Sequence, residues 1–353
     1  MKVKIIGAGS IGNHHAKACR TMGWDVTVVD TSLDALERMK CEIYPTRYGE
    51  WDSEIKLRHD YSGGNDVPKG GFDIIMVDTP PNVRMALAIE ALKEQPKLLH
   101  LEKPLCQPET FFSSGLELFS YNFLNIFPCM ATVGYNHAVS KSIEKVVEII
   151  KIGEIGPVIA LDVEFREHWE GIFKAHPWLK GPEDSYLGDW RKGGGAGGEH
   201  SHALHLWLYL AKMANLGDVA NVKSAFDMVE NKYDRVAAFT LQTSEGKIGR
   251  VIQDVVTKPP RKWARVQGTE GFVQWDCNEW GLSGDVVRFA GKFSGQKEKT
   301  IFVSKNRQLD FLWMMQHYDD LLSGKTSYKD SPLHIEFGVK VMSILHDAHH
   351  SDF

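Results

Sequence analysis

Three side chains that can move protons stand at helical spacing directly after the most glycine-dense stretch of the chain, residues 193–198. Glu199 and His202 would share one helix face, and His202 and His205 are also three residues apart, so an acid and two imidazoles can converge. Histidine has a pKa near neutrality and can accept the hydroxyl proton when a secondary alcohol is oxidised. We therefore predict an acid/base site here, with the glycines letting the backbone approach a ligand.

Two other interpretations of this segment stay open. Histidine and glutamate are good zinc ligands, but the spacing is not HExxH and no further ligand cluster is evident, so we expect no metal. The simplest alternative is a capped helix that carries surface histidines.

Two short motifs directly follow predicted strands. Thr79-Pro80-Pro81 comes after 74–77, and Glu102-Lys103-Pro104 comes after 97–101. In a parallel sheet both lie at the carboxyl edge, where ligands of doubly wound folds bind. Lys103 could also be a solvated loop lysine, and the two prolines could form only a rigid turn.

A glycine turn links the first predicted strand, 3–6, to a helix that ends before Gly23. In this turn Gly7 would let the chain reverse, Gly9 would let a pyrophosphate approach the backbone, and Gly12 would let the helix pack on the sheet. The free N–H groups of the helix would bind the phosphates. An ordinary tight turn is the alternative. The predicted cofactor-binding residues of the turn are Gly7, Ala8, Gly9, Ser10, Ile11 and Gly12.

Asp30 ends the second predicted strand, 26–29, eighteen positions after Gly12. A carboxylate there would accept hydrogen bonds from the hydroxyls of the adenosine ribose and would repel a 2′-phosphate. We therefore expect NAD(H) rather than NADP(H) as the cofactor.

The pattern of elements divides the chain in two. Strands at 3–6, 26–29, 74–77, 97–101 and 130–133 alternate with helices, which predicts an α/β, Rossmann-type, doubly wound parallel sheet over residues 1–133. In residues 134–353, strand-like runs follow one another between a helix at 142–152 and two closing helices, 309–322 and 333–346. This half predicts an α+β domain with an open, largely antiparallel sheet.

Length and composition agree with this division. A chain of 353 residues exceeds the ~250–300 residues at which single cores stop growing. The net charge of −5 gives no general field for a polyanion, so we expect no nucleic-acid partner. Five widely spaced cysteines, no signal-peptide core and no long apolar stretch lead us to expect a cytoplasmic protein without a membrane span.

Taken together, the motifs resemble those of the Gfo/Idh/MocA family of NAD(P)-dependent oxidoreductases, and the resemblance covers nearly the whole chain. It implies a Rossmann domain followed by a substrate domain whose open sheet commonly mediates oligomerisation, so a homodimer or homotetramer is expected. The motifs are Gly7–Gly12, Thr79–Asn82, Glu102–Pro104, Val133–Asn136, Gly153–Gly156, Trp190-Arg191, and Gly193–Gly195 followed by Glu199 and His202.

The resemblance also implies roles for individual residues. Lys103 would lie near the nicotinamide and the reacting oxygen, Glu102 would contact the nicotinamide ribose, and Thr79 and Pro80 would line the cofactor. His202 would be the acid/base, and Glu199 takes a position often held by aspartate. The sequence departs from the family at His205, where many relatives carry aspartate, and at Asp78, where a small or apolar residue is usual.

The expected activity is hydride transfer between NAD(H) and a secondary hydroxyl or keto carbon of a sugar, cyclitol or nucleotide sugar. Two alternatives remain: an enzyme that uses bound NAD transiently for elimination or glycoside cleavage, and a non-catalytic sensor of the same fold. A mixture of aromatic and hydrogen-bonding groups suits a polyhydroxylated ring. The candidate substrate residues are Tyr135, Asn136, His137, Arg166, His168, Trp190, Arg191 and His205.

Overall fold

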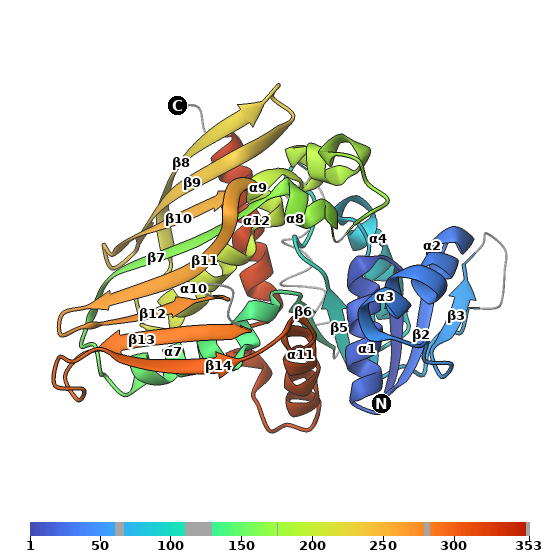
Figure 1. Cartoon of the computed structure of the whole chain (residues 1–353), viewed down its shortest axis with the longest axis horizontal. Coiled ribbons are helices and arrows are strands. Elements are labelled where there is room, and N and C mark those ends of the chain that lie inside the picture. The colour runs from blue at the N-terminus through green and yellow to red at the C-terminus, as the bar shows by residue number, and fades with distance from the viewer. Residues whose placement is uncertain (61–66, 110–128, 175, 279–282, 351–353) are drawn as a thin grey trace.

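The computed structural model describes residues 1–60, 67–109, 129–174, 176–278 and 283–350, and within them the strands form two sheets (Figure 1). The first sheet is six-stranded and parallel, in the order β3-β2-β1-β4-β5-β6. Runs such as Ile74–Val77 consist of apolar residues buried on both faces, as in most parallel sheets. Its strands are β1 (Lys2–Ile6), β2 (Asp25–Asp30), β3 (Lys56–His59), β4 (Ile74–Val77), β5 (Leu98–Leu101) and β6 (Met130–Val133).

Helices connect these strands. The first one, α1, begins at Ser10 directly after the glycine turn. Its N-cap residue is Gly9, which has no side chain to cap the helix. Ser32 caps α2 by accepting a hydrogen bond from the N–H of Ala35, as its position before an apolar pattern predicts. The helical segments are α1 (Ser10–Thr21), α2 (Leu33–Arg38), the π-helical η1 (Met39–Ile43), α3 (Tyr44–Tyr48) and α4 (Pro81–Lys93).

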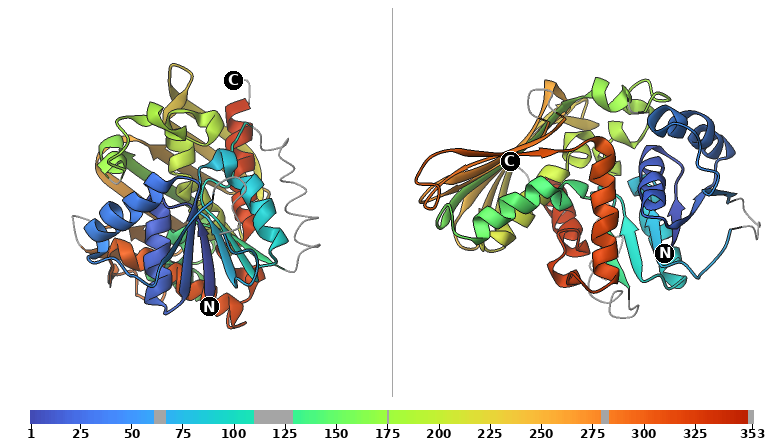
Figure 2. Two further views of the ribbon diagram at one scale, coloured as in Figure 1. Left: turned by 90° about the vertical axis from the view of Figure 1, so that its right-hand side faces the viewer. Right: turned by 60° about the horizontal axis from the view of Figure 1, so that its bottom comes forward.

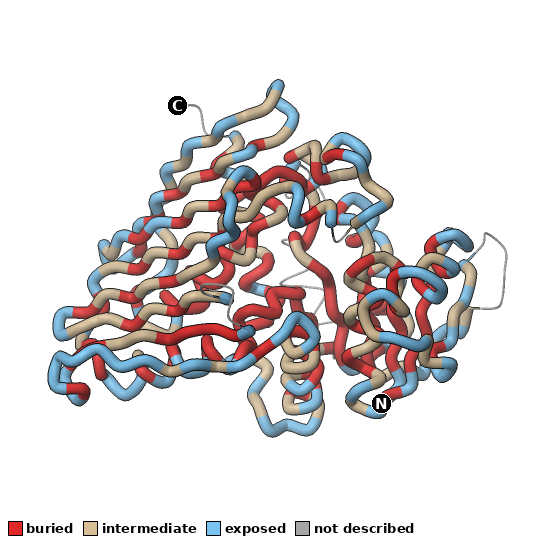
Figure 3. Tube along the Cα trace, viewed as in Figure 1, coloured by how far each residue is buried: buried red, intermediate tan, exposed pale blue. Residues whose placement is uncertain are grey.

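The second sheet has eight strands in the order β14-β13-β12-β11-β7-β10-β9-β8. Every neighbouring pair is antiparallel except β7 and β10. Burial alternates along strands such as β7, whereas the inner strands β4 and β5 of the first sheet are buried at every residue (Figure 3). The strands are β7 (Val158–His168), β8 (Val219–Val229), β9 (Tyr233–Thr243), β10 (Ile248–Asp254), β11 (Val256–Gly268), β12 (Phe272–Asp276), β13 (Gly284–Ala290) and β14 (Lys299–Ser304).

Helices pack on one face of this second sheet (Figures 1 and 2). Helix α10 contacts β7 and β10, α7 contacts β12 and β13, and α12 contacts β8. Short 3-10 turns, η3 (Asn136–Val139), η4 (Pro182–Asp184), η5 (Tyr186–Gly188) and η6 (Trp190–Lys192), join the elements, and η8 (Tyr328–Asp330) precedes the last helix. The helices are α7 (Lys141–Lys151), α8 (Trp169–Lys174), α9 (Gly195–Glu199), α10 (His202–Met213), α11 (Arg307–Leu322) and α12 (Ile335–His350).

The chain returns to the first sheet at its C-terminal end. Helix α11 packs on α1, α12 packs on β6, and Thr132 forms a bridge with His334. The predicted division at residues 133 and 134 therefore separates the two sheets, while two helices of the second half complete the surroundings of the first. The division into domains itself stays a prediction.

The predicted fold class, a Rossmann-type parallel sheet followed by an open and largely antiparallel sheet, is confirmed. Several strands were not predicted. β3 lies within 49–71, which its polar and glycine-rich composition marks as a loop. β11 carries Pro259 and Pro260 at the register shift between Val256 and Arg261, and residue propensities do not predict a strand that contains two prolines. Strands β13 and β14 were also missed. No helix in the described residues is long and apolar enough to span a membrane.

Candidate active site

A cleft of about 860 Å³ lies between the glycine turn, the loops after β5 and β6, and the helix that follows the glycine-rich stretch. Of the predicted site residues, Lys103, Glu199 and His202 all line it. Ser10 and Ile11 of the predicted cofactor turn line it as well. The fold therefore brings the predicted acid/base residues and part of the predicted dinucleotide turn to one cavity.

Lys103 and Glu199 form the central ion pair of this cleft. The Lys103 ammonium donates to the backbone carbonyl of Glu199 at 2.8 Å and to its carboxylate at 3.0 Å. The two side chains are only 12% and 18% exposed. Burial alone would raise the pKa of Glu199, but Lys103 and His200 outweigh it and lower that pKa below its ordinary value. Glu199 is therefore a carboxylate at neutral pH, and Lys103 is held at one position in the cleft.

His202 begins α10 and is partly buried among aromatic rings. Its ring stacks on Phe165 at 6.0 Å between centroids and meets the edges of Tyr135 at 5.4 Å and His137 at 5.0 Å. Its Nδ1 is buried without a hydrogen-bond partner among the described residues. Burial, with further contributions from His137 and Lys103, lowers the pKa of His202 well below 6.5. His202 is therefore a neutral imidazole at pH 7 and can accept a proton.

The glycines of 193–198 serve the packing of the chain on itself. A Cβ on Gly194 would lie 2.2 Å from the carbonyl oxygen of Tyr186, and one on Gly198 would lie 2.0 Å from that of Gly193. Gly195 has a positive φ of 73° and approaches Asp234 as closely. The expectation that these glycines make room for a ligand is thus wrong at these positions, because the protein's own atoms fill the space.

The glycine turn after β1 has the geometry predicted for it. A Cβ on Gly12 would meet the Gly7 carbonyl oxygen at 2.0 Å, so only glycine lets α1 pack against the turn. Gly9 by contrast has no atom within 4 Å of its Cβ position, which leaves open space where the backbone could meet a phosphate. Asp30 accepts the N–H of Ala8 at 2.8 Å through its carboxylate, and therefore stands directly beside the turn.

Some predicted cofactor residues lie away from the cleft lining, and an arginine near the glycine turn that does line it was not predicted. Thr79 and Pro80 do not line this cleft, although the Thr79 carbonyl accepts a hydrogen bond from Arg84. Arg47 of α3, by contrast, does line it and donates to the carbonyl and the hydroxyl of Ser10 at 2.9 and 2.8 Å. This guanidinium adds a positive charge beside the start of α1, where anions bind.

Only two of the eight predicted substrate residues line the cleft, Asn136 and His137. Both are buried, and the Asn136 Oδ1 and His137 Nδ1 atoms have no hydrogen-bond partner among the described residues. Such atoms are costly unless a ligand or water satisfies them. Burial lowers the pKa of His137 well below 6.5, so this ring too is neutral.

The other six candidates lie elsewhere. Tyr135 and His205 stack on one another in the core at 4.1 Å, and His205 is also hydrogen-bonded to the Pro332 carbonyl. Trp190 stacks on His349, away from the cleft lining. Arg191 instead donates to the Asn231 carbonyl. None of these four lines the cleft.

Arg166 and His168 lie on β7, each one residue away from a side chain that lines the cleft. Phe165 and Glu167 of the same strand line the cleft, and Arg166 instead pairs with Asp254 at 2.5 Å. Because successive side chains of a strand point to opposite faces, a choice of even over odd positions selects the wrong face. The cleft residues that the sequence analysis missed include Arg47, Phe165, Glu167, His200, Lys262 and Arg307.

Part of the chain matches the model of a known protein family. Residues 143–274 match the model of the GFO/IDH/MocA C-terminal domain, and the predicted resemblance to that family is confirmed. No curated protein sequence matches the chain.

Solved structures share the fold over nearly the whole chain. An oxidoreductase from Agrobacterium radiobacter, in complex with NAD+, L-tartaric acid and magnesium, is 19% identical with a TM-score of 0.73 and covers 99% of this chain and 96% of its own. A levoglucosan dehydrogenase in complex with NADH is 14% identical, with a TM-score of 0.73 and coverage of 99% and 95%. The UDP-N-acetylglucosamine 3-dehydrogenase of Acidithiobacillus ferrooxidans is 12% identical, with a TM-score of 0.69 and coverage of 99% and 96%.

Proposed function

We propose that this chain is an NAD(H)-dependent oxidoreductase that acts on a secondary hydroxyl or keto carbon of a sugar, cyclitol or nucleotide sugar. The observation that carries the proposal is the meeting of the Lys103–Glu199 ion pair, a neutral His202 and the glycine turn at one cleft. The solved structures that share the fold include dehydrogenases of sugars and a nucleotide sugar, which supports this substrate class.

The residues at the glycine turn fit a dinucleotide. The start of α1 has no side-chain cap, Gly9 leaves open space, and Asp30, which lies beside Ala8, would accept hydrogen bonds from the hydroxyls of the adenosine ribose. When bound, the nicotinamide supplies the acceptor or donor of hydride. Its 2′-phosphorylated form would meet the charge of Asp30, so NAD(H) is the proposed cofactor.

His202 would accept and return the substrate proton. When the alcohol is oxidised, the neutral imidazole would accept the hydroxyl proton as hydride leaves the carbon that carries this hydroxyl. Lys103 would stabilise the negative charge that develops on the oxygen. Burial is the main cause of the low pKa of His202, and the charge of Lys103 lowers it further. Glu199 holds the ammonium through two hydrogen bonds. In the reductive direction His202 would return the proton.

Polar atoms of the cleft suit a polyhydroxylated substrate. Asn136 Oδ1 and His137 Nδ1 are buried polar atoms without a hydrogen-bond partner among the described residues. Glu167 and Lys262 form a further ion pair at 3.1 Å in the lining. Hydroxyl groups can satisfy acceptors and donors of this kind. We also expect a homodimer or homotetramer formed through the open sheet, which size-exclusion chromatography with light scattering would test.

The test is a screen of sugars, cyclitols and nucleotide sugars for the formation of reduced nicotinamide, monitored by its absorbance. Steady net formation of NADH with one class of polyol is the expected result. Product formed without net NADH would instead support transient use of bound NAD in elimination or glycoside cleavage. Cofactor binding without turnover of any polyol would favour the sensor.

A further inference from the structure

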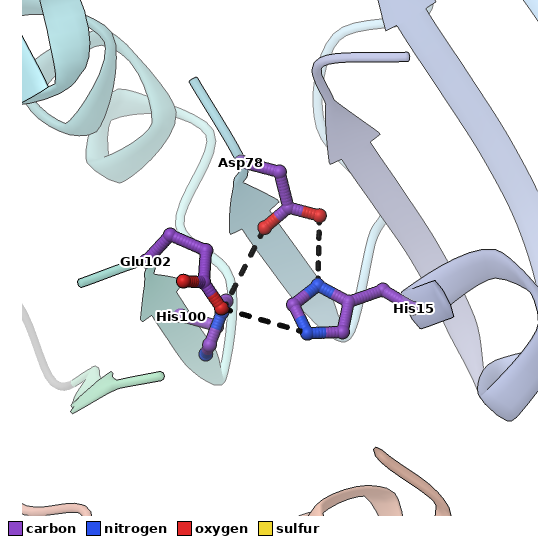
Figure 4. A group of neighbouring side chains, drawn as sticks. All are labelled: His15, Asp78, His100 and Glu102. Atoms are coloured by element: carbon purple, nitrogen blue, oxygen red, sulfur yellow. Dashed lines mark hydrogen bonds and ion pairs between the residues drawn. The ribbon is translucent and has the colours of Figure 1, made fainter. Parts of the chain in front are cut away.

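Four ionisable side chains gather beneath the cleft, at the carboxyl edge of the first sheet (Figure 4). His15 comes from α1, Asp78 directly follows β4, His100 lies on β5, and Glu102 follows that strand. The side chains of His15, Asp78 and His100 are fully buried, and that of Glu102 is 6% exposed. Three segments that are far apart in the sequence thus place two imidazoles and two carboxylates in one small volume.

Three polar atoms that face this volume are within ion-pair distance of the cluster's other groups but have no hydrogen-bond partner among the described residues. His15 Nε2, Asp78 Oδ1 and His100 Nε2 are buried and form no hydrogen bond with any described residue. Buried polar atoms are nearly always hydrogen-bonded or bound to an ion. Three such atoms at one place therefore indicate an occupant.

The spacing of these atoms suits a metal ion. His100 Nε2 lies 3.7 Å from Asp78 Oδ1 and 3.6 Å from Glu102 Oε1, and His15 Nε2 lies 3.8 Å from the same glutamate oxygen. These separations are too long for hydrogen bonds. A tetrahedral zinc ion with bonds of about 2.0–2.2 Å separates its ligands by roughly 3.3–3.6 Å, and Glu102 Oε1 lies at nearly this spacing from the Nε2 atoms of both His15 and His100.

The outer atoms of both imidazoles are already engaged. His15 Nδ1 lies 2.7 Å from the second carboxylate oxygen of Asp78, and His100 Nδ1 lies 2.6 Å from the hydroxyl of Tyr318. In the tautomer that donates the Nδ1 proton outward, each Nε2 would carry a lone pair toward the centre, which is how metal-binding histidines are commonly oriented. Gly134 permits this packing, since a Cβ there would lie 2.3 Å from Glu102 Oε1.

We infer that His15, His100 and Glu102 bind one divalent transition-metal ion of the zinc class, and that Asp78 orients His15 from outside the metal's ligand shell. Imidazole and carboxylate ligands are typical of such ions, and two carboxylates balance its charge in the buried setting. The ion would join α1 to the end of β5 below the cleft, so its role is structural. Glu102 would bind the ion through Oε1, while its Oε2 accepts the N–H of Lys103 at 3.0 Å.

The experiment uses the full chain without an affinity tag. The protein is stripped with a chelator, incubated with zinc chloride, passed through a desalting column and assayed for metal by mass spectrometry. We expect about one retained zinc ion per chain and a higher melting temperature than that of the stripped protein. Folded wild-type protein that retains no zinc would overturn the proposal and leave a buried water or proton network as the occupant.

Variants locate the ion. Asp78→Asn and His100→Gln preserve size and should each lose at least about tenfold in zinc affinity. His346→Ala/His350→Ala is the matched control, because it removes the histidines of the C-terminal helix and should retain the metal. Retention in the first two variants, or loss only in the control, would contradict the assignment. If the cluster variants do not fold, zinc anomalous scattering from wild-type crystals decides, and an ion located elsewhere would refute the proposal.

Discussion

The Lys103 ammonium is held by both the backbone carbonyl and the carboxylate of Glu199, at 2.8 and 3.0 Å, although 96 residues separate the two in the chain. This contact ties the loop after β5 to the segment that leads into His202. An ammonium fixed in this way needs no reorganisation to stabilise a developing alkoxide, which is the condition for strong electrostatic catalysis.

Replacing Lys103 by methionine should therefore lower turnover by at least ~10² while NADH binding stays nearly intact. The variant removes the charge and keeps an unbranched side chain. Lys192→Met removes an exposed lysine and serves as the control, with turnover expected near that of the wild type. Steady-state rates and a fluorescence titration with NADH measure the two effects. Wild-type turnover in Lys103→Met would exclude a role for this lysine in the chemistry.

Asp30 should determine cofactor choice. Its carboxylate stands beside the glycine turn through Ala8 and also accepts the N–H of Ser32 at 2.8 Å. We predict that the wild type binds NAD(H) more tightly than NADP(H), because the carboxylate repels a 2′-phosphate, and that Asp30→Ser narrows the gap. Asp30→Asn, which keeps a hydrogen-bond acceptor, controls for loosening of the turn. Calorimetric titrations that show tighter NADP(H) binding to the wild type would contradict the assignment.

His205 should matter to stability more than to chemistry. Its ring stacks on Tyr135 at 4.1 Å, it is hydrogen-bonded to the Pro332 carbonyl at 2.8 Å, and burial lowers its pKa to about 3. His205→Ala leaves a buried carbonyl unpaired and removes a ring contact, so the free energy of unfolding should fall by about 2–4 kcal/mol. Denaturant titration measures this loss. A variant of unchanged stability but abolished turnover would instead indicate a substrate contact.

Asp234 should make stability depend on pH. Burial raises its pKa from 3.8 to about 7, and the neighbouring His349, at 3.9 Å, is neutral because burial lowers its own pKa to about 3. The folded state therefore keeps the proton that the unfolded chain releases, and stability falls as pH rises from about 4 to 7.

Asp234→Asn removes this titration. Between pH 5 and pH 8 the wild type should lose about 2–3 kcal/mol relative to the variant, at ~1.4 kcal/mol per pKa unit. Denaturant titrations of both proteins at the two pH values give the difference directly. Parallel losses in the two proteins would show that Asp234 is already ionised in the folded state.

The sequence indicated much of the first sheet because its strands are short runs of apolar residues that end at glycine, proline or acidic residues. Runs such as 74–77 and 130–133 are strands with the predicted bounds. β11 escaped prediction because two prolines interrupt its pattern. The alternation of side chains along a strand also does not show which face lines a cleft. For this reason Arg166 was predicted as a site residue in place of Phe165.

Contacts between segments that are far apart in the chain could not be predicted from the spacing of residues in the sequence. The pattern of residues suggested that Lys103 and Glu199 serve one site, but their hydrogen bonds depend on how the two sheets meet. The same holds for Asp78, whose departure from the family pattern had no explanation in the sequence. In the fold, its carboxylate meets His15 and faces His100, which gives the departure a physical reason.

His202 is proposed to take the substrate proton, and a comparison of two reaction rates tests this role most directly. With a polyol identified by the screen, the steady-state rate of NADH formation is measured for the wild type and for His202→Asn. Asparagine keeps a polar side chain of similar reach but cannot act as a base at neutral pH. The account predicts a fall in turnover of at least ~10² with NADH binding nearly intact. A rate of NADH formation equal to that of the wild type would contradict it.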